Sequence, residues 1–311
     1  MTETTLLAVD GGGTKTEFVL LAPDGRVLRR VRLGASNPFD IGFDGTEALL
    51  REGFAAILRG SAPAAAFAGL SGGGSGSSSE KLKAVLERIL PGVPAAAGSD
   101  MINAIASGSL SGDGCAVIAG TGSSAFARKD GAVTRCGGWG NFFDGAGSGY
   151  DLGAGAIAHT LRVHDGRDAP SLLSELTVKA LGGSPADLLT DIYAGGKRKV
   201  ASVAPAVFEA CDAGDERARA LIERTADYLA EIVSTVCRRA GLTQTPVVCI
   251  GGLWNRRDLL LPRFTAGLTP GLSPIFPDAP PVFGAAAEAA RLAGVPVTPA
   301  FRERFLQTWE D

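Results

Sequence analysis

Two glycine-rich segments of the chain have the composition of phosphate-binding loops. The first, Asp10-Gly-Gly-Gly-Thr-Lys-Thr16, follows the apolar run 6–9 and so places a carboxylate at the end of a predicted strand. Its glycines leave the backbone bare, which lets amide N–H groups approach phosphate oxygens closely. A P-loop would need lysine directly after the second glycine of its pattern and a helix behind it, whereas here Thr14 intervenes and a strand follows. The segment predicts a phosphate-binding hairpin, with an ordinary glycine-rich turn as the alternative; Asp10 is then either a magnesium-linked carboxylate or a turn aspartate.

The second segment, Gly120-Thr121-Gly122-Ser123-Ser124-Ala125, also follows an apolar run, 115–119. Its spacing satisfies the GxGxxA fingerprint of dinucleotide-binding proteins, but that interpretation requires a helix next. The residues that follow, 126–131, have instead the pattern of a strand and a turn. A second phosphate-contacting hairpin, facing the first across a cleft, accounts for both segments with one architecture.

Three further segments could take part in the chemistry. Asp100 stands where a predicted strand ends and a helix begins, so its carboxylate could accept a proton from a substrate hydroxyl, although a helix N-cap is the commoner role of such an aspartate. Glycines surround Trp139 in the stretch 136–149, which suits a small polar ligand beside an aromatic ring or, equally, a core tryptophan between turns. Gly251-Gly252 follows the predicted strand 247–250 and could lie under a nucleotide base or ribose, or form a plain turn.

Composition narrows the class of protein. The 311 residues include 30 Lys and Arg against 33 Asp and Glu, a formal net charge of −3, which disfavours nucleic acid and anionic membranes as partners. The five cysteines include no close pair, so we expect no disulfide framework, zinc site or iron–sulfur site within the chain. His159 and His164, the two histidines, are five residues apart and support neither a metal site nor a catalytic triad. Without a signal-like N-terminus or an apolar run of 18 residues, the chain is expected to be soluble and cytoplasmic.

The elements expected around these segments form two copies of one unit. Each phosphate segment joins two predicted strands, and Thr14 precedes the turn residue Asp24 by about the distance that separates Thr121 from Asp130. This repeat predicts an α/β fold of two duplicated lobes. We place the first lobe at 1–112 and the second, with a helical insertion, at 113–297, and we expect a C-terminal helix within 298–311 to pack back on the first lobe.

Two stretches have less specific patterns. The run 71–79, Ser-Gly-Gly-Gly-Ser-Gly-Ser-Ser-Ser, has the composition of a flexible linker, but it lies between a predicted strand, 64–70, and a predicted helix, 80–90. We therefore interpret it as a mobile active-site loop, with an interdomain linker as the alternative. Residues 149–240 are predicted to be mostly helical, with an apolar stripe that includes Tyr228.

Taken in order, these segments, together with Leu70-Ser71-Gly72-Gly73 and Gly137-Gly138-Trp139-Gly140, resemble the BadF/BadG/BcrA/BcrD-type ATPase family over nearly the whole chain. Within that family the chain is most similar to the N-acetylglucosamine kinases. The resemblance implies a fold of the sugar kinase, heat-shock and actin-like type, with two duplicated actin-like (ribonuclease H-like) lobes and an interlobe cleft that closes over ATP and sugar. It implies an ATP- and Mg²⁺-dependent kinase that phosphorylates the 6-hydroxyl of N-acetylglucosamine or glucosamine, and we expect a homodimer.

The same resemblance implies a role for each matching residue. Asp100 would be the catalytic base, and Asp10 would help to organise Mg²⁺ and the phosphates. ATP and its phosphates would be bound by Gly12, Gly13, Thr14, Lys15, Gly120, Thr121, Gly122, Gly251 and Gly252. The sugar would be bound by Asn37, Ser71, Gly138, Trp139 and Asp144, together with Asp100. Such roles suit phosphoryl transfer, in which positioning and charge neutralisation supply most of the catalysis.

One segment departs from the family pattern. After Gly-Gly-Trp-Gly the family has Gly-Asp-Glu-Gly-Ser, whereas this chain has Asp144-Gly145-Ala146-Gly147-Ser148. The sugar-binding aspartate is thus displaced by one position and the glutamate is absent, which should change the preference among sugars. Two other functions stay open. One is a non-kinase ATPase that drives a partner enzyme, disfavoured by the spacing of the cysteines; the other is a ligand-sensing regulator, disfavoured by the lack of a DNA-binding segment or zinc motif.

Overall fold

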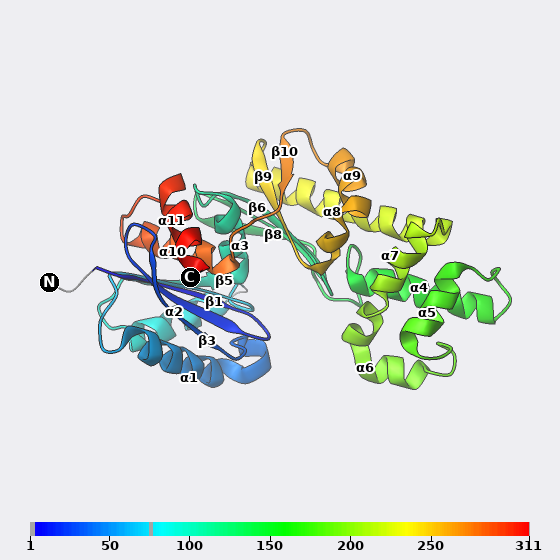
Figure 1. Cartoon of the computed structure of the whole chain (residues 1–311), viewed down its shortest axis with the longest axis horizontal. Helices are drawn as coiled ribbons and strands as arrows, with labels where there is room; N and C mark the ends of the chain where they lie inside the picture. The colour runs from blue at the N-terminus through cyan, green and yellow to red at the C-terminus, as the bar shows by residue number, and fades with distance from the viewer. Residues whose placement is uncertain (1–3, 75–76, 311) are drawn as a thin grey trace. The chain divides into compact units, whose positions relative to one another are not determined.

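Unit 1 of the protein is built on a five-stranded sheet. The computed structural model describes residues 4–74 and 77–310, and the chain divides into two compact units, of which the first comprises Met1–Gly114 and Phe276–Asp311 (Figure 1). The antiparallel strands β1 (Leu6–Gly11), β2 (Thr16–Leu21) and β3 (Val27–Leu33) are followed by α1 (Pro38–Leu58), β4 (Ala65–Leu70), α2 (Ser78–Ile89), β5 (Ala95–Ser99) and α3 (Asp100–Gly108). β4 pairs in parallel with both β1 and β5. The sheet order is therefore β3-β2-β1-β4-β5.

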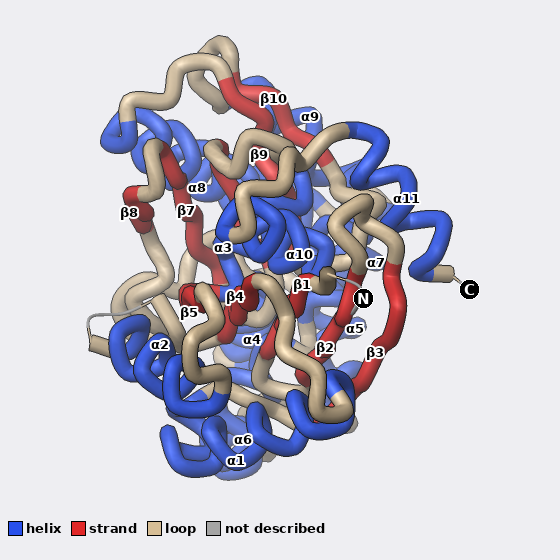
Figure 2. The backbone as a smooth tube through the Cα atoms, turned by 90° about the vertical axis from the view of Figure 1, so that its left-hand side faces the viewer, coloured by secondary structure: helices blue, strands red, loops and turns tan. Residues whose placement is uncertain are grey.

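Alternate residues of the central strand β1 enter two different cores. Leu7 and Val9 pack with residues of α1 and α2 on one face of the sheet. Leu6 and Ala8 pack on the other face with α10 (Pro281–Leu292) and α11 (Pro299–Trp309), next to residues of α3. Figure 2 shows α1 and α2 below β1 and β4, and α3 and α10 above them. Burial on both faces explains why the strand is an uninterrupted apolar run.

Unit 2, Cys115–Ile275, repeats this arrangement and adds helices. Its strands are β6 (Gly114–Ala119), β7 (Ser123–Lys129), β8 (Ala132–Cys136), β9 (Thr245–Ile250) and β10 (Leu272–Ile275). Between β8 and β9 lie α4 (Gly149–His164), α5 (Leu172–Leu181), α6 (Leu189–Ala201), α7 (Ala204–Asp212) and α8 (Glu216–Ala240). Between β9 and β10 lie the 3₁₀ helix η1 (Gly252–Arg256) and α9 (Arg257–Gly267).

The two sheets have the same topology. In unit 2 the order is β10-β9-β6-β7-β8, so the strands of each unit stand, by their rank in the chain, in the order third, second, first, fourth, fifth. The predicted α/β fold of two duplicated units is confirmed. The turn between β7 and β8 falls at Asp130-Gly131, where both residues have positive φ, 51° and 80°, as a two-residue hairpin requires.

The structure differs from the sequence prediction in several places. The returning segment of unit 1 begins at Phe276, not at 298, so that α10 as well as α11 belongs to this unit. The reason is that α10 is rich in alanine and is buried almost all round, against α3 and the sheet, a role that amphipathic periodicity does not reveal. Helix α1 begins at Pro38 rather than near 43 and is interrupted at Gly42. The short strands β8 and β10 are not among the strands that the sequence analysis predicts.

The serine- and glycine-rich run 71–79 is shorter as a loop than predicted. Residues 71–74 form a turn, the structure does not describe 75 and 76, and α2 already begins at Ser78. The predicted mobile loop lies partly outside the described residues. Across the described parts of the chain, no helix combines the length and the apolar character needed to cross a membrane.

Candidate functional site

In unit 1 the parallel strands bring three polar side chains to one edge of the sheet. The register of β1 and β4 pairs Asp10 with Gly69, and β5 lies beside β4 in the same direction. Asp10 is therefore the last residue but one of β1, while Ser71 and Asp100 directly follow the neighbouring strands β4 and β5. The hydroxyl groups of Ser71 and Ser99 donate hydrogen bonds to the carboxylate of Asp100, with 3.0 Å between Ser99 Oγ and Asp100 Oδ1.

Asp100 begins α3, but the helix cap is supplied by its neighbour. The side chain of Ser99 accepts a hydrogen bond from the backbone N–H of Met101 over 3.2 Å. Burial raises the pKa of Asp100 above its ordinary value, and hydrogen bonds from Ser99 and other donors oppose that rise. A carboxylate with a raised pKa holds a proton more strongly, which is the property that a general base needs.

The carboxylate of Asp10 is held by Asn103, a residue that the sequence analysis did not single out. Asn103 is fully buried on α3, and its Nδ2 donates hydrogen bonds to Asp10 Oδ1 over 2.6 Å and to the carbonyl oxygen of Gly69 over 3.2 Å. Burial raises the pKa of Asp10 to about 6, while the bond from Asn103 lowers it and the nearby charge of Asp100 adds to the rise. The signal in the sequence was the spacing Asp100-x-x-Asn103, which puts both residues on one helix face.

The first glycine segment forms the turn between β1 and β2. The N–H of Gly12 donates to the carbonyl oxygen of Lys15 over 2.9 Å and closes the turn. A Cβ on Gly12 or Gly13 would have no neighbour nearer than 3.5 Å, so this backbone is not packed against other atoms. Thr14 and Lys15 are exposed, and the ammonium of Lys15 lies 3.5 Å from Glu17. The turn presents bare backbone next to Asp10, as a phosphate-binding hairpin would.

Asn37 lies on the chain that leads into α1 of the same unit. Its Oδ1 caps the helix by accepting a hydrogen bond from the N–H of Phe39 over 3.0 Å. The same oxygen would lie 2.7 Å from a Cβ on Gly72, so Asn37 stands beside the turn that follows Ser71. The structure therefore brings Asn37 to the segment that joins β4 to α2.

The second glycine segment forms the equivalent turn in unit 2. The N–H of Gly120 donates to the carbonyl oxygen of Gly122 over 2.9 Å, as Gly12 does to Lys15 in unit 1. The first turn of α4 is hydrogen-bonded to this hairpin: the N–H of Gly149 donates to the carbonyl oxygen of Gly120 over 2.7 Å. Thr121 at its tip is exposed.

A cavity of about 550 Å³ lies beside this second hairpin. Its lining includes Thr121, the apolar ring of Phe208 and the polar side chain of Asn255, together with Gly252. Gly251 has φ 108°, and a Cβ there would lie 2.4 Å from the carbonyl oxygen of Ala119, so only glycine lets the end of β9 approach β6. The volume and the mixed lining suit a small organic ligand.

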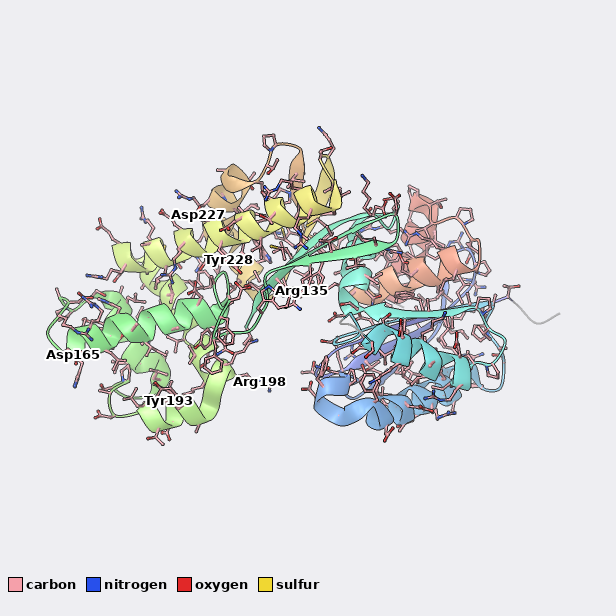
Figure 3. The ribbon with its side chains drawn as sticks, turned by 180° about the vertical axis from the view of Figure 1, so that it is seen from behind. Arg135, Asp165, Tyr193, Arg198, Asp227 and Tyr228 are labelled. Carbon is pink, nitrogen blue, oxygen red and sulfur yellow. The ribbon has the colours of Figure 1, made fainter. Side chains whose placement is uncertain are left out.

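A smaller cavity of about 250 Å³ in unit 2 is lined in part by Gly138 and Asp144. Asp144 accepts hydrogen bonds from the hydroxyl of Tyr228 on α8 and, over 3.3 Å, from the N–H of Trp139. Burial and this carboxylate raise the pKa of Tyr228. The side chain of Trp139 is 69% exposed, and the guanidinium of Arg135 lies over its ring, 4.7 Å from the ring centre. Arg135 and Tyr228 are labelled in Figure 3. The apolar stripe predicted within residues 149–240 includes Tyr228 but does not indicate that its hydroxyl group binds Asp144.

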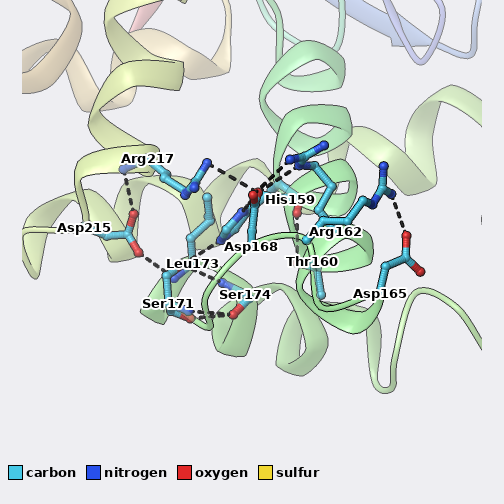
Figure 4. A network of polar contacts seen from close by, with 12 residues as sticks. His159, Thr160, Arg162, Asp165, Asp168, Ser171, Leu173, Ser174, Asp215 and Arg217 are labelled. Atoms are coloured by element: carbon cyan, nitrogen blue, oxygen red, sulfur yellow. Dashed lines mark hydrogen bonds and ion pairs between the residues drawn. The ribbon is translucent and has the colours of Figure 1, made fainter.

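A Ser-His-Asp arrangement also occurs in unit 2 (Figure 4). His159 Nε2 lies 2.9 Å from Ser171 Oγ, and His159 Nδ1 lies 3.3 Å from Asp168 Oδ2. However, Ser171 caps α5 in a capping box with Ser174, and Arg162 binds both oxygens of Asp168 over 2.9 and 3.0 Å. With His159 only 6% exposed, these groups stabilise helix junctions rather than attack a substrate.

The residues at the edge of the unit 1 sheet fit a magnesium ion better than a fully protein-bound metal. Within the described residues, no group of three or more His, Cys, Asp or Glu side chains is arranged to hold a metal ion. Magnesium is usually held by one or two carboxylates together with water and substrate phosphates. Asp10, beside the first hairpin and within electrostatic reach of Asp100, matches that requirement.

Two units with one strand order, each with a glycine hairpin between its first two strands, define the actin-like class of duplicated α/β proteins. The chain belongs to the BadF/BadG/BcrA/BcrD ATPase family, which it matches over residues 7–289.

Relatives of the chain extend over most of its length. An N-acetyl-D-glucosamine kinase from Dictyostelium discoideum is 27% identical over 282 residues, which cover 84% of this chain and 88% of that protein. An N-acetylmuramic acid/N-acetylglucosamine kinase from Clostridium acetobutylicum is 28% identical over 273 residues, with coverage of 83% and 88%. A solved structure from Chromobacterium violaceum, named as a candidate N-acetylglucosamine kinase, has a TM-score of 0.68 and 28% identity and covers 93% of this chain and 99% of its own.

Proposed function

We propose that this protein is an ATP-dependent sugar kinase that phosphorylates the 6-hydroxyl of an amino sugar, N-acetylglucosamine or glucosamine. The observation that carries the proposal is the edge of the unit 1 sheet, where Asp100 stands near Asp10 beside a bare glycine turn. The membership in an ATPase family and the names of the relatives support ATP as the donor and a sugar as the acceptor.

Asp100 is the proposed general base. Its carboxylate takes the proton of the 6-hydroxyl, whose oxygen forms a bond to the γ-phosphorus as the bond from that phosphorus to the β–γ bridging oxygen breaks and ADP leaves. The raised pKa of Asp100, which burial causes, makes it a stronger base than an exposed aspartate. The hydroxyl groups of Ser71 and Ser99 orient the carboxylate through their hydrogen bonds.

The phosphates of ATP are proposed to lie on the two glycine hairpins. Gly12, Gly13, Thr14 and Lys15 form the first, and Gly120, Thr121 and Gly122 form the second. The cavity of about 550 Å³ beside the second hairpin, with Gly252 in its wall and Gly251 before it, would take the adenosine. Asp10 would hold Mg²⁺ jointly with the phosphates, and the ion would neutralise the charge that develops during transfer.

The sugar is proposed to contact residues of both units. In unit 1 these are Asn37, Ser71 and Asp100, which the structure brings to neighbouring strand ends and turns. In unit 2 they are Gly138, Trp139 and Asp144, of which the last is oriented by two hydrogen bonds. A carboxylate held in this way discriminates between hydroxyl patterns, because a sugar without the matching hydroxyl would leave it unpaired.

The protein is further proposed to act in the cytoplasm as a homodimer. All five cysteines are free, which fits a reducing compartment. Phe142 and Phe143 are 87% and 91% exposed, and adjacent exposed aromatic rings are a common feature of surfaces that a second subunit covers. Light scattering that gave the mass of one chain would contradict the homodimer.

The test is ADP production from MgATP with N-acetylglucosamine, glucosamine, glucose, N-acetylmannosamine, N-acetylmuramate or no sugar, with the product identified by mass and NMR. We expect turnover with an amino sugar, phosphate at its 6-oxygen, and no turnover with the 6-deoxy analogue. Asp100→Asn should lower kcat by about 10² to 10⁴ while leaving ATP binding intact. Asp44→Asn, the same change at an exposed position of α1, is the matched control.

Two results would contradict the proposal. ADP release that is independent of sugar would indicate an ATPase that acts on a partner. A near-native rate for Asp100→Asn would exclude Asp100 as the base even if the sugar kinase activity is found.

A further inference from the structure

Lys197 stands on α6 in a stretch, Gly195-Gly196-Lys197-Arg198-Lys199, that the motifs above do not explain. Gly196 interrupts the helix with φ 54° and ψ −149°, directly before Lys197. The lysine side chain reaches the second hairpin, because a Cβ on Gly122 would lie 3.1 Å from its Nζ. Lys197 also lines the cavity of about 250 Å³ together with Thr121. An ammonium group thus stands next to bare backbone of the hairpin.

Backbone contacts fix α6 relative to this hairpin. The first turn of α4 is hydrogen-bonded to the hairpin through Gly149. One turn later α4 meets α6 so closely that a Cβ on Gly153 would lie 1.9 Å from the carbonyl oxygen of Val200. The hairpin, α4 and the second half of α6 are therefore one connected framework. The position of Lys197 follows from that framework rather than from the side chain alone.

Lys197 has no direct polar partner among the residues that the structure describes. Lys197 is exposed and has no hydrogen bond or ion pair with residues 4–74 or 77–310. The carboxylate in the same cavity, Asp144, is bound to Tyr228 and to the N–H of Trp139. By contrast, Lys15 at the first hairpin has Glu17 3.5 Å away. Within the described residues, the lysine beside the second hairpin thus has no ion pair, whereas the lysine of the first hairpin has one.

We propose that Lys197 binds phosphoryl oxygens of the nucleotide at the second hairpin. This inference rests on the proposed function and adds a cationic residue to its nucleotide site. An ammonium group gives a charge-assisted hydrogen bond to a phosphate oxygen, which is stronger than a bond from a neutral donor. The bond would act on the phosphate chain of ATP and ADP and not on the adenosine.

The test measures binding without sugar, so that it does not depend on turnover. Isothermal titration with MgATP, MgADP and adenosine compares the wild type with Lys197→Gln and Lys199→Gln. Lys197→Gln should weaken MgATP and MgADP by about tenfold to a hundredfold and leave adenosine unchanged. Lys199→Gln is the control, because it removes a positive charge two residues away, from a side chain that packs against Gly195. It should leave the affinities for MgATP, MgADP and adenosine unchanged. Lys197→Arg should restore most of the affinity.

Several outcomes would overturn the inference. Equal affinity of the wild type and Lys197→Gln for MgATP would remove Lys197 from the site and leave the nucleotide proposal standing. An equal loss in Lys199→Gln would show that only the net charge of α6 matters. A wild type that binds no nucleotide at all would overturn the inference and the proposed function together.

Discussion

Replacing Asp10 with asparagine should make unit 1 more stable, although Asp10 is a proposed site residue. Burial raises the pKa of this carboxyl group from 3.8 to about 6. At about 1.36 kcal/mol per pKa unit, the ionised carboxylate then costs the folded state about 3 kcal/mol. Asparagine has nearly the same shape, carries no charge and still offers Asn103 an oxygen that accepts its hydrogen bond.

The effect of Asp10→Asn depends on pH with a defined sign. Because the pKa is raised on folding, the wild type loses stability as the pH rises from 3.8 to about 6, and no more is lost above that range. The gain in the variant is therefore absent below pH 3.8, about half complete at pH 5 and about 3 kcal/mol at pH 8.

The assay follows unit 1 separately from unit 2. Trp309 on α11 stacks on Phe305 in unit 1, while Trp139 and Trp254 belong to unit 2. Labelling with 5-fluorotryptophan gives each tryptophan its own ¹⁹F resonance, and the signal of Trp309 in urea reports the free energy of unfolding of unit 1. A variant that is no more stable than the wild type at pH 8, or that gains equally at pH 5 and pH 8, would refute the reasoning.

Two further substitutions each test one contact of a proposed site residue, the first in unit 1 and the second in unit 2. In Gly69→Ala the new Cβ would lie 2.2 Å from Asn103 Oδ1. Urea unfolding should therefore show a loss of about 1–3 kcal/mol in the free energy of unfolding, and turnover should fall. Gly34→Ala, whose Cβ would have no atom within 4 Å, is the control and should match the wild type. Tyr228→Phe removes the hydroxyl group that holds Asp144 and should raise the KM for sugar about tenfold at unchanged KM for ATP; steady-state kinetics that showed an unchanged sugar KM would mean that Asp144 needs no such support.

Much of the local structure could be predicted because it depends on neighbouring residues. Apolar runs, glycine turns and the pair Asp130-Gly131 predicted both hairpins and their repetition, and the two sheets of the structure have the same strand order. The ordered glycine motifs also indicated the family that the chain matches over residues 7–289. Turn chemistry and side-chain periodicity act over a few residues, so the sequence alone carries them.

The surroundings of the proposed site residues were decided only by tertiary structure. Asp10 and Asp100 are ninety residues apart in the chain, and it is the parallel register of β1, β4 and β5 that brings them to one edge. Asn103 is a functional partner only because α3 places its amide against Asp10. Tyr228 had the apolar spacing of a core residue, yet its hydroxyl meets Asp144 from a distant loop.

The same distinction explains why the sequence analysis includes α10 in the second lobe, 113–297, although the helix packs in unit 1. Its side chains are small and apolar on nearly every face of the helix, so the sequence predicts a buried helix but not the surface against which the helix packs. Strand pairing and helix docking depend on the shape and charge of surfaces that are far apart in the sequence. Periodicity along the chain contains no information about those distant surfaces, and only the folded structure shows which of them meet.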